Sequence, residues 1–404
     1  MNGCSGKAAG QLRRRSKEKH GMHQAEYSVV RAACACFFIC PGLAYGVLTS
    51  RMPALKMQTG ADEAEIGLLL LCLGLSSLVA LFCSSRAIAR WGSARVLRTA
   101  SLALALAVAL CCLSQSPVQL GAGCLLTGMS MGLVDVSINT QGIQIERRYR
   151  SRCMSFMHAA YSFGGVTGSL SGALSAALGL SPFVNAVCVL GVYSFFRLWA
   201  SRRLLDDLPE ASPGREKASG SLPLFVVLCG VLSMLAYAAE GSVAEWGSLL
   251  LFTVKGAGEE TAALVFAAFS LTTVFCRLFG DRLRSGMGDF PLLLSGSLLA
   301  FCGMFVVLRS SSAALCLAGY ALMGAGLSPL VPLFFSRAGS VPGISAGRAS
   351  AVVSLLSYSG LLFFPPFLGF VARDRGLPDA LLIVLAACLC LAAGSVFFRG
   401  GKKR

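Results

Sequence analysis

The stretch LLLLCLGLSSLVALFCSSR, residues 68–86, returns in altered form as LVFAAFSLTTVFCRLFGDR, residues 264–282. The two copies are separated by an offset of 196 residues, which places Ser76 on Thr272 and Arg86 on Arg282. The same offset, without gaps, carries Gly92 onto Gly288, Gly128 onto Gly324, Arg152 onto Arg348 and Gly164 onto Gly360. Because one offset holds over so long a stretch, the sequence predicts two similar halves.

The apolar runs of this chain are long enough to cross a lipid bilayer. Of its 404 residues, 55% are hydrophobic and only 13% are charged, whereas a soluble domain has about 25% charged residues. Each window of about 20 apolar residues can form one spanning helix. Twelve such windows are found, at 28–49, 65–84, 96–115, 119–143, 154–178, 181–200, 222–247, 261–281, 290–308, 313–336, 349–371 and 378–398. We therefore predict an all-α membrane protein with twelve transmembrane helices in two six-helix bundles.

The basic residues indicate the orientation. Most of the 35 Lys and Arg lie between apolar runs, in segments that share one side of the membrane. The other side holds only Arg51, Lys56, Lys255, Arg309, Arg373 and Arg375. Cytosolic loops carry the excess of positive charge, so both termini are predicted to be cytosolic. The net charge of +16 is explained by this topology, and nucleic acid is not expected as a partner because no basic face with interleaved aromatics is found.

These features predict five segments. Residues 1–27 form a disordered, cytosolic basic tail, and 28–200 form the first six-helix bundle. The polar stretch 201–221 has the composition of a linker. Residues 222–398 form the second bundle and 399–404 a second basic tail. Each half has six spans, an even number, so both halves start on the same side of the membrane and run in the same direction. A cavity is then expected between them near the midplane.

The loop after the second span, SSRAIARWGSARVLR at 84–98, resembles the signature Gly-x-x-x-Asp-Arg-x-Gly-Arg-Arg of the major facilitator superfamily. Arg90, Gly92 and Arg95 match that signature, whereas Ala89 stands at the acidic position and Ser85 at the first glycine. The second copy, GDRLRSGMG at 280–288, keeps Asp281, Arg282 and Gly288. The resemblance implies the major facilitator fold and transport by alternating access. It also implies a cytosolic gate, with Arg86, Arg90, Arg277, Asp281 and Arg282 as its candidates. For Arg277, Asp281 and Arg282, an ordinary positive-inside cluster is the alternative.

Four further stretches resemble a bacterial inner-membrane branch similar to the fucose-permease group. They are SRMPALK (50–56), LVDVSINTQGIQIERR (133–148), MSFMHAAYSFGG (154–165) and SMLAYAAEGSVAEW (233–246). In that group a carboxylate on the fourth span is implicated in proton-coupled sugar uptake. The resemblance therefore implies the bacterial cytoplasmic membrane as location, protons and a small polar solute as cargo, and Asp135 as the proton carrier.

Asp135 also stands out without the resemblance, because charged residues within spans are rare and mark functional sites. Gly128, Gly132, Asp135, Asn139 and Gly142 recur at spacings of four and three, so they form one stripe of a helix. Glycines on such a stripe permit close packing between helices, which predicts that the stripe does not face lipid. Asp135 is interpreted either as an exchangeable proton carrier or as a structural acid hydrogen-bonded to Asn139 or His158.

The neighbouring span adds polar side chains at matching depths. At ~1.5 Å per helical residue, Tyr161 and Ser162 lie nearly level with Asp135, and His158 lies level with Asn139. These residues are candidates for lining the substrate cavity, and for His158 a structural hydrogen bond is an equal alternative. Glu240 on the seventh span is the last cavity candidate.

Three further features concern the ends and the bends of the spans. Glu245 and Trp246 stand at the predicted outer end of the seventh span, where interfacial anchoring is expected. Asp62 and Glu65 have the spacing of a capping box. Pro329, Pro332, Pro365 and Pro366 lie in spans of the second half, where they are expected to loosen the helices.

Other classes of function fit the sequence less well. The sequence contains no nucleophile elbow, phosphate loop or His-rich cluster that would indicate an enzyme, and no cofactor is expected. The pairs Cys34–Cys36 and Cys388–Cys390 are not expected to bind metal, because residues two apart on a helix point to different sides. A drug-efflux antiporter of the same fold typically has Gly-Pro in its fifth span, and SFGGVTGSLSGALS (162–175) has no proline. A non-transporting membrane sensor remains a further alternative, and a monomer is expected.

Overall fold

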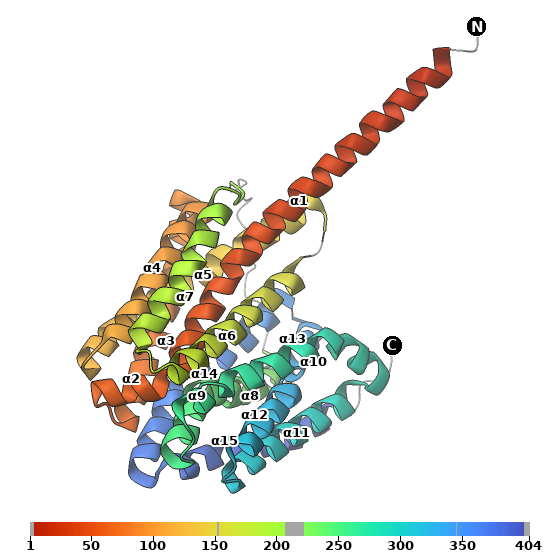
Figure 1. Cartoon of the computed structure of the whole chain (residues 1–404). Coiled ribbons are helices and arrows are strands. Elements are labelled where there is room, and N and C mark those ends of the chain that lie inside the picture. The colour runs from red at the N-terminus through yellow and green to blue at the C-terminus, as the bar shows by residue number, and fades with distance from the viewer. Residues whose placement is uncertain (1–3, 152, 207–221, 345, 400–404) are drawn as a thin grey trace.

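The computed structural model describes residues 4–151, 153–206, 222–344 and 346–399, and every regular element in them is helical. The first half contains seven helices, which lie side by side in Figure 1. They are α1 (Cys4–Ser50), α2 (Met52–Thr59), α3 (Glu63–Trp91), α4 (Ser93–Leu113), α5 (Pro117–Tyr149), α6 (Met154–Ala177) and α7 (Pro182–Ser201). The short α2 connects two long helices, so this half has six long helices, as predicted.

The second half repeats this plan with more interruptions. Its elements are α8 (Leu224–Leu249), a π-helical turn (Leu250–Val254), α9 (Glu259–Ala262), α10 (Val265–Met287), α11 (Asp289–Arg309), α12 (Ala313–Leu327), α13 (Leu330–Gly339), α14 (Ala346–Arg375), α15 (Leu377–Gly394) and a 3-10 turn (Ser395–Phe398). The predicted tenth span is broken between α12 and α13, at Ser328 and Pro329. Pro365 and Pro366, by contrast, lie inside the continuous helix α14. Residues 207–221 of the predicted linker are outside the described residues.

The predicted repeat corresponds to one helix contact that occurs in both halves. A Cβ atom on Gly128 of α5 would collide with the Leu73 carbonyl oxygen and the Ser76 hydroxyl of α3. A Cβ atom on Gly324 of α12 would likewise collide with the Phe269 carbonyl oxygen and the Thr272 hydroxyl of α10. All three pairs of positions differ by the same 196 residues. Glycine at both sites therefore permits the same close approach of two helices.

The turn after the second long helix is also duplicated. Gly92 and Gly288 both have positive φ, at 79° and 85°, a region that glycine enters without steric cost. The Gly92 amide donates to the Ile88 carbonyl, and the Gly288 amide donates to the Arg284 carbonyl. The signature glycine therefore ends one long helix and starts the next in both halves.

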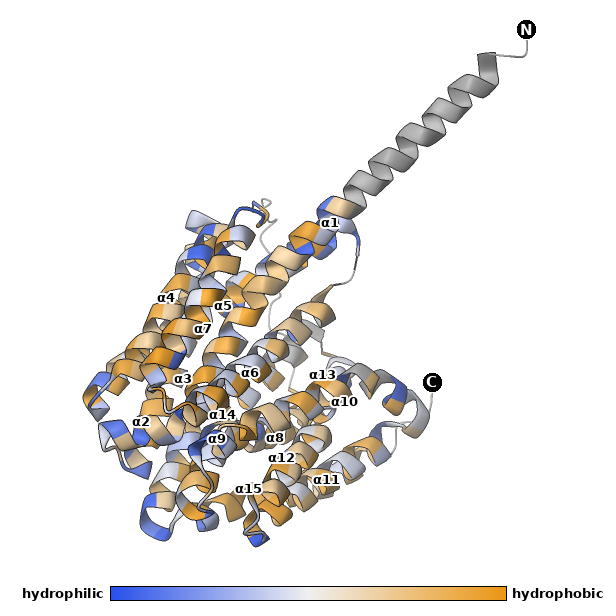
Figure 2. Ribbon diagram, viewed as in Figure 1, coloured by the Kyte–Doolittle hydropathy of each residue, from blue (hydrophilic) through white to orange (hydrophobic). Residues whose placement is uncertain are grey.

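The described residues contain eleven helices that are long and apolar enough to cross a membrane. The twelfth long helix, α6, does not meet that measure, because its 24 residues are rich in Gly and Ser and include His158 and Tyr161. It packs closely against α1 instead. Apolar residues form a broad belt around the bundle, and polar residues gather at its two ends (Figure 2). The chain is thus a multi-pass membrane protein.

The helix α1 is assigned from Cys4 onward (Figure 1), and the disorder predicted for the basic tail at residues 1–27 stays a prediction. The tail sequence KAAGQLRRRSKEKH contains several strong helix formers. A span that already forms a helix removes the cost of nucleation, which favours helix in the residues that precede it.

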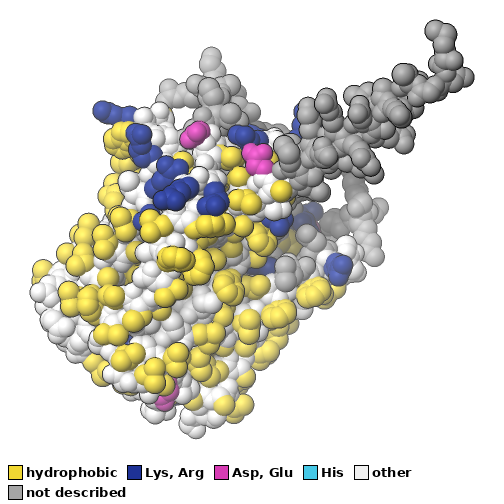
Figure 3. Space-filling model, turned by 45° about the horizontal axis from the view of Figure 1, so that its top comes forward, with side chains coloured by type: hydrophobic (Ala, Val, Ile, Leu, Met, Phe, Trp, Pro, Cys, Tyr) yellow, Lys and Arg dark blue, Asp and Glu magenta, His cyan; other side chains and the backbone are white. Residues whose placement is uncertain are grey.

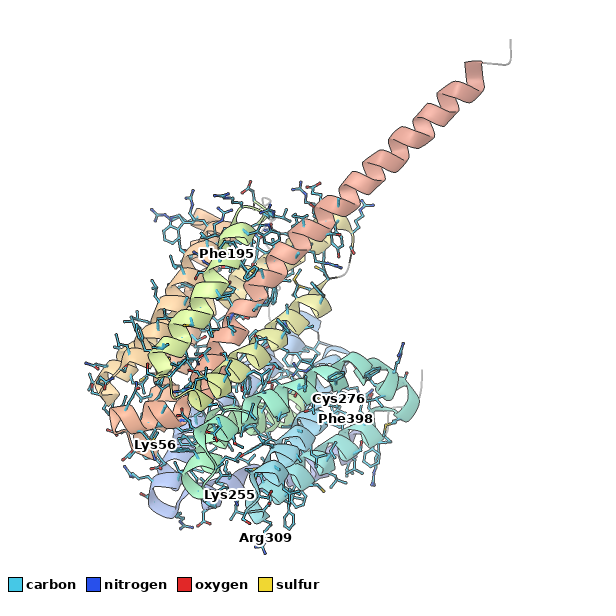
Figure 4. The ribbon with its side chains drawn as sticks, viewed as in Figure 1. Lys56, Phe195, Lys255, Cys276, Arg309 and Phe398 are labelled. Atoms are coloured by element: carbon cyan, nitrogen blue, oxygen red, sulfur yellow. The ribbon has the colours of Figure 1, made fainter. Side chains whose placement is uncertain are left out.

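The bundle has two different ends. Lys and Arg side chains gather at the end from which α1 projects, next to the hydrophobic belt (Figure 3); we refer to it as the basic end. The opposite end holds α2, α9 and the turn at Leu180, and we refer to it as the α2 end. Lys56, Lys255 and Arg309 lie there (Figure 4).

Candidate functional site

Asp135 lies midway along α5 and faces the other half of the molecule. Its side chain has exposed surface although protein atoms surround it closely. It lies within electrostatic range of Tyr161 on α6 and of Tyr237 and Tyr358 on the second half. Asn139 donates to the backbone carbonyl of Asp135 at 2.8 Å and to its carboxylate at 3.3 Å. The acid is therefore both hydrogen-bonded and accessible.

Glu240 and Arg277 form an ion pair near Asp135. Glu240 Oε1 on α8 lies 3.8 Å from Arg277 Nη2 on α10, and both side chains are partly exposed. The Arg277 guanidinium also interacts electrostatically with His158 and Tyr161 of the first half. Sequence reasoning grouped Arg277 with the basic end, whereas the structure brings it to the polar side chains of both halves.

We refer to Asp135, Tyr161, Glu240 and Arg277, together with the two tyrosines that face them, as the central site. Those tyrosines, Tyr237 and Tyr358, were not singled out from the sequence. Their rings are parallel, at an interplanar angle of 9°, with centroids 6.3 Å apart.

His158 and Ser162, both predicted to line the cavity, lie on α6 beside the central site. His158 is exposed, and its ring packs edge-on against Phe38 at a centroid distance of 5.7 Å. Ser162 donates its hydroxyl proton to the His158 backbone carbonyl at 3.3 Å. The side chain of Ser162 is thus engaged within its own helix.

Three of the polar contacts that join the two halves lie at the α2 end. Ser248 Oγ of α8 donates to the Thr49 carbonyl of α1 at 2.9 Å, and Ser169 Oγ of α6 donates to the Ala263 carbonyl at 2.6 Å. Arg51 Nε lies 3.2 Å from Glu259 Oε1 of α9. These contacts close the space between the halves at this end.

Arg51 is held from both sides of that junction. Its side chain is only 2% exposed, and its guanidinium donates to the Gly172 carbonyl at 3.3 Å and to the Leu180 carbonyl at 2.7 Å. Burial lowers the pKa of Arg51, and the Glu259 carboxylate opposes that shift. Since arginine keeps its proton throughout the physiological range, the pair stays charged.

At the basic end, the second half has a charge cluster around Asp289. Its carboxylate accepts from Arg284 Nε at 2.8 Å and lies 3.3 Å from Arg337 Nε. The equivalent positions in the first half, 196 residues earlier, are Ser93 and Gln141, and Gln141 Nε2 donates to Ser93 Oγ at 2.7 Å. Both halves therefore have a side-chain contact at this position, which is an ion pair in the second half and a neutral hydrogen bond in the first.

The other predicted gate residues remain separate from this cluster. Arg86, Arg90 and Arg282 are exposed, and Arg90 lies over the Trp91 ring at 5.5 Å. The side chain of Asp281 is outside the described residues. None of these positions shows a contact between the halves within the part of the chain that the structure describes.

The expectation that Glu245 and Trp246 anchor the protein at the membrane interface is wrong. Glu245 is 7% exposed and Trp246 is 0% exposed. The reason is the length of the helix, because α8 continues to Leu249 and passes directly into the π-helical turn that ends at Val254. The sequence contained a signal that Glu245 faces the interior. One helical stripe, at spacings of four and three, contains Tyr237, Gly241, Glu245 and Ser248.

Metal binding finds no support in the described residues, where no group of three His, Cys, Asp or Glu side chains is placed to hold an ion. The sixteen cysteines whose side chains the structure describes are free thiols, and many of them are buried. The central site instead offers two carboxylates, one guanidinium and three phenols. Such a set can bind a polar molecule and exchange protons.

Two helical halves around a polar site define a membrane transporter, and comparisons with known proteins specify the family. The model of the Major Facilitator Superfamily matches residues 34–365. An uncharacterized MFS-type transporter of Yersinia pestis is 31% identical over 367 residues, which are 89% of this chain and 93% of the relative. Membrane protein MosC of Rhizobium meliloti is 31% identical over 369 residues, or 91% and 89% of the two chains. The chain belongs to the major facilitator superfamily, and it is a transporter rather than an enzyme.

Solved structures show the same fold. The nucleoside transporter NupG matches with a TM-score of 0.70 at 14% identity, over 92% of this chain and all of the other. A D-xylose-proton symporter matches with a TM-score of 0.71 at 14% identity, over 92% and 97% of the two chains.

Proposed function

We propose that this protein is a proton-coupled transporter that takes up a small polar solute across the bacterial cytoplasmic membrane. The basic end faces the cytosol, in agreement with the positive-inside rule. The three polar contacts at the α2 end then close the external side, and Asp135 is accessible from the cytosol. The conformation is an inward-facing state of an alternating-access cycle.

The observation that carries the proposal is the carboxyl of Asp135 in the middle of a spanning helix, accessible and facing the second half. An ionised Asp at the bilayer centre costs ~2.5–3.5 kcal/mol on insertion scales. That cost is removed when the carboxylate binds a proton, or when a group of the substrate compensates its negative charge. Asp135 can therefore take a proton in one state of the cycle and release it in the other.

The substrate class follows from the remaining side chains of the central site. The Glu240–Arg277 pair offers both hydrogen-bond acceptors and donors, and the parallel rings of Tyr237 and Tyr358 offer an apolar face. A small ring with several hydroxyl groups matches this combination. The names of the two structural neighbours, a nucleoside transporter and a D-xylose-proton symporter, agree with such a solute.

The test combines a binding screen with a flux assay. Purified protein is screened by thermal shift against sugars, sugar acids, nucleosides, amino acids and drugs, and each hit is then tested in proteoliposomes. With one proton per solute, a membrane potential of 100 mV supports about 50-fold accumulation, since it supplies ~2.3 kcal/mol per charge. Asp135→Asn should lose this accumulation and keep the exchange of labelled for unlabelled solute across the membrane.

Other outcomes contradict the proposal. Full gradient-driven accumulation by Asp135→Asn excludes Asp135 as the carrier. Binding without any flux identifies a sensor, and resistance to several hydrophobic drugs on expression identifies an efflux antiporter.

A further inference from the structure

Glu245 is a buried acid that the proposed role of Asp135 does not use. It lies on α8, one to two turns of helix from Glu240 towards the α2 end. Its Oε2 atom has no hydrogen-bond partner among the described residues. The narrow space that it lines with Tyr237, Gly241, Leu361 and Phe364 has no room for a water molecule. In this conformation neither protein nor water compensates a full negative charge on the carboxylate.

The contact that Glu245 does make crosses between the halves. The hydroxyl of Tyr45 on α1 lies within side-chain hydrogen-bonding reach of the Glu245 carboxyl. The Tyr45 ring packs edge-on against Phe266 of α10, with ring centroids 5.4 Å apart. One turn further along α8, Ser248 bonds to the Thr49 carbonyl, one turn further along α1. The Tyr45–Glu245 pair therefore belongs to the same junction as the contacts that close the α2 end.

We propose that Glu245 is a second proton-binding site, and that its protonation allows the α2 end to close. When α1 and α8 separate, the carboxyl loses Tyr45, meets external water and ionises. Closure requires the carboxylate to take one proton from that water and become a neutral carboxyl group, which then re-forms the bond with Tyr45. This inference rests on the proposed transport cycle, but it assigns a different proton from the one on Asp135.

The charged and titratable groups around Glu245 are few. Tyr45 contacts it from α1, and Tyr161 of α6 and Glu240 of α8 interact electrostatically with Tyr45. From α14, the lining residues are Gly360, Leu361, Phe364 and Pro365, which do not titrate. At the α2 end, the Arg51–Glu259 and Lys56–Glu63 pairs each combine opposite charges. Glu240 is likewise paired with Arg277, whereas Glu245 is a buried acid for which the described residues show no basic partner.

The neighbouring Trp246 provides a natural reporter of closure. The protein has three tryptophans; Trp246 is fully buried, whereas Trp91 and Trp199 are exposed by 52% and 42%. In a Trp91→Phe/Trp199→Phe background, the fluorescence comes from Trp246 alone. Protein in lipid nanodiscs is titrated with acrylamide between pH 5 and pH 8. We expect Trp246 to be shielded from acrylamide at low pH and to be quenched with a several-fold larger Stern–Volmer constant at high pH.

Three variants separate the proton site from a structural role. Glu245→Gln keeps the size and polarity of the side chain and should leave Trp246 shielded at every pH. Ser248→Ala removes a neutral bond of the same junction, so it should increase quenching at every pH and preserve the pH dependence. Asp135→Asn should also preserve that dependence, although it loses coupled transport. A failure of the proposed function is therefore distinguishable from a failure of this inference.

Infrared difference spectroscopy supplies a second measurement, which does not depend on the reporter. The closed state should show the C=O band of a protonated carboxyl that is absent from Glu245→Gln. The inference is overturned if Glu245→Gln keeps the wild-type pH dependence of quenching, if the wild type shows none, or if this band remains in Glu245→Gln.

Discussion

The two halves of the molecule share a packing scheme and differ in their chemistry. Gly128 and Gly324 permit the same helix contact, 196 residues apart. At the same offset, however, Asp135 corresponds to Val331, and Glu245 corresponds to Thr49. The acids of the proposed proton sites thus stand on opposite halves without counterparts. Duplicated packing suits the proposed rocking of two similar bodies, and the unequal side chains are where we propose that protons are coupled to that motion.

The charge cluster at the basic end shows the same difference on a smaller scale. Asp289 and Arg337 are partly exposed, with 14% and 27% of their side chains accessible. Their counterparts, Ser93 and Gln141, are both fully buried. An ion pair is tolerated where water reaches it, and a neutral hydrogen bond replaces it where water does not.

The largest expected loss of stability comes from substitutions that disrupt the helix contact shared by the two halves. Gly128→Leu forces a side chain against the Leu73 carbonyl of α3, which is backbone and cannot move without shifting a helix. Overpacking a core costs about 1–3 kcal/mol when side chains alone adjust, so we expect a larger loss and little folded protein. Gly324→Leu should do the same in the second half.

The control for both glycines is Gly191→Leu on α7, where a Cβ atom meets no neighbour within 4 Å. Size-exclusion profiles and melting temperatures of the three variants measure the effect. Normal yield and stability for Gly128→Leu would show that the duplicated contact does not determine the fold.

The next effect tests why the first half uses a neutral bond. Ser93→Asp places a carboxylate at a site with no exposed area, next to the amide of Gln141. An uncompensated buried charge destabilises by about 3–5 kcal/mol, and we expect a melting temperature well below that of the wild type.

Ser93→Asp/Gln141→Arg, which copies the second half, should recover only part of this loss because the site stays dry. In the reverse exchange, Asp289→Ser/Arg337→Gln should be close to neutral. If the charged pair is as stable in the first half as in the second, burial is not the reason for the difference.

A moderate effect is expected at the junction between the halves. Glu259→Gln removes the charge opposite Arg51 but leaves the two carbonyl bonds of the guanidinium. We expect a loss of about 1–2 kcal/mol of stability and greater acrylamide quenching of Trp246. Glu260→Gln makes the same charge change at the exposed neighbouring residue and should have little effect.

The reciprocal variant Arg51→Glu/Glu259→Arg should not restore the junction, because its new carboxylate would face the carbonyl oxygens of Gly172 and Leu180. Full recovery of stability in that variant would show that only the pairing of opposite charges matters, and that the carbonyl bonds to the guanidinium do not.

The sequence predicted what depends on local pattern. The repeat offset, the long helices and the capping box at Asp62 all follow from spacing along the chain. The contact of Glu240 with Arg277 was not predictable, because it depends on how α8 and α10 lie together. The error at Glu245 came from a span predicted to end at residue 247, whereas the helical path continues through the π-helical turn. Hydropathy identifies a span well, but it places the ends poorly.

The smallest expected effect concerns the start of the helices at the α2 end, where the halves differ once more. Asp62 Oδ1 accepts from the Glu65 amide at 2.7 Å, and Glu65 Oε2 accepts from the Asp62 amide at 2.9 Å. The residue at the equivalent position in the second half, Gly258, precedes α9 and gives no side-chain cap.

Asp62→Ala should therefore cost about 1 kcal/mol, a shift of a few degrees in melting temperature, with little change in transport. Gly258→Asp should not give the matching gain, because the added carboxylate would lie against Glu260, whose side-chain oxygens already occupy that space. If Gly258→Asp stabilises the protein as much as Asp62→Ala destabilises it, capping is interchangeable between the halves. In that case the asymmetry at this end has no electrostatic cause.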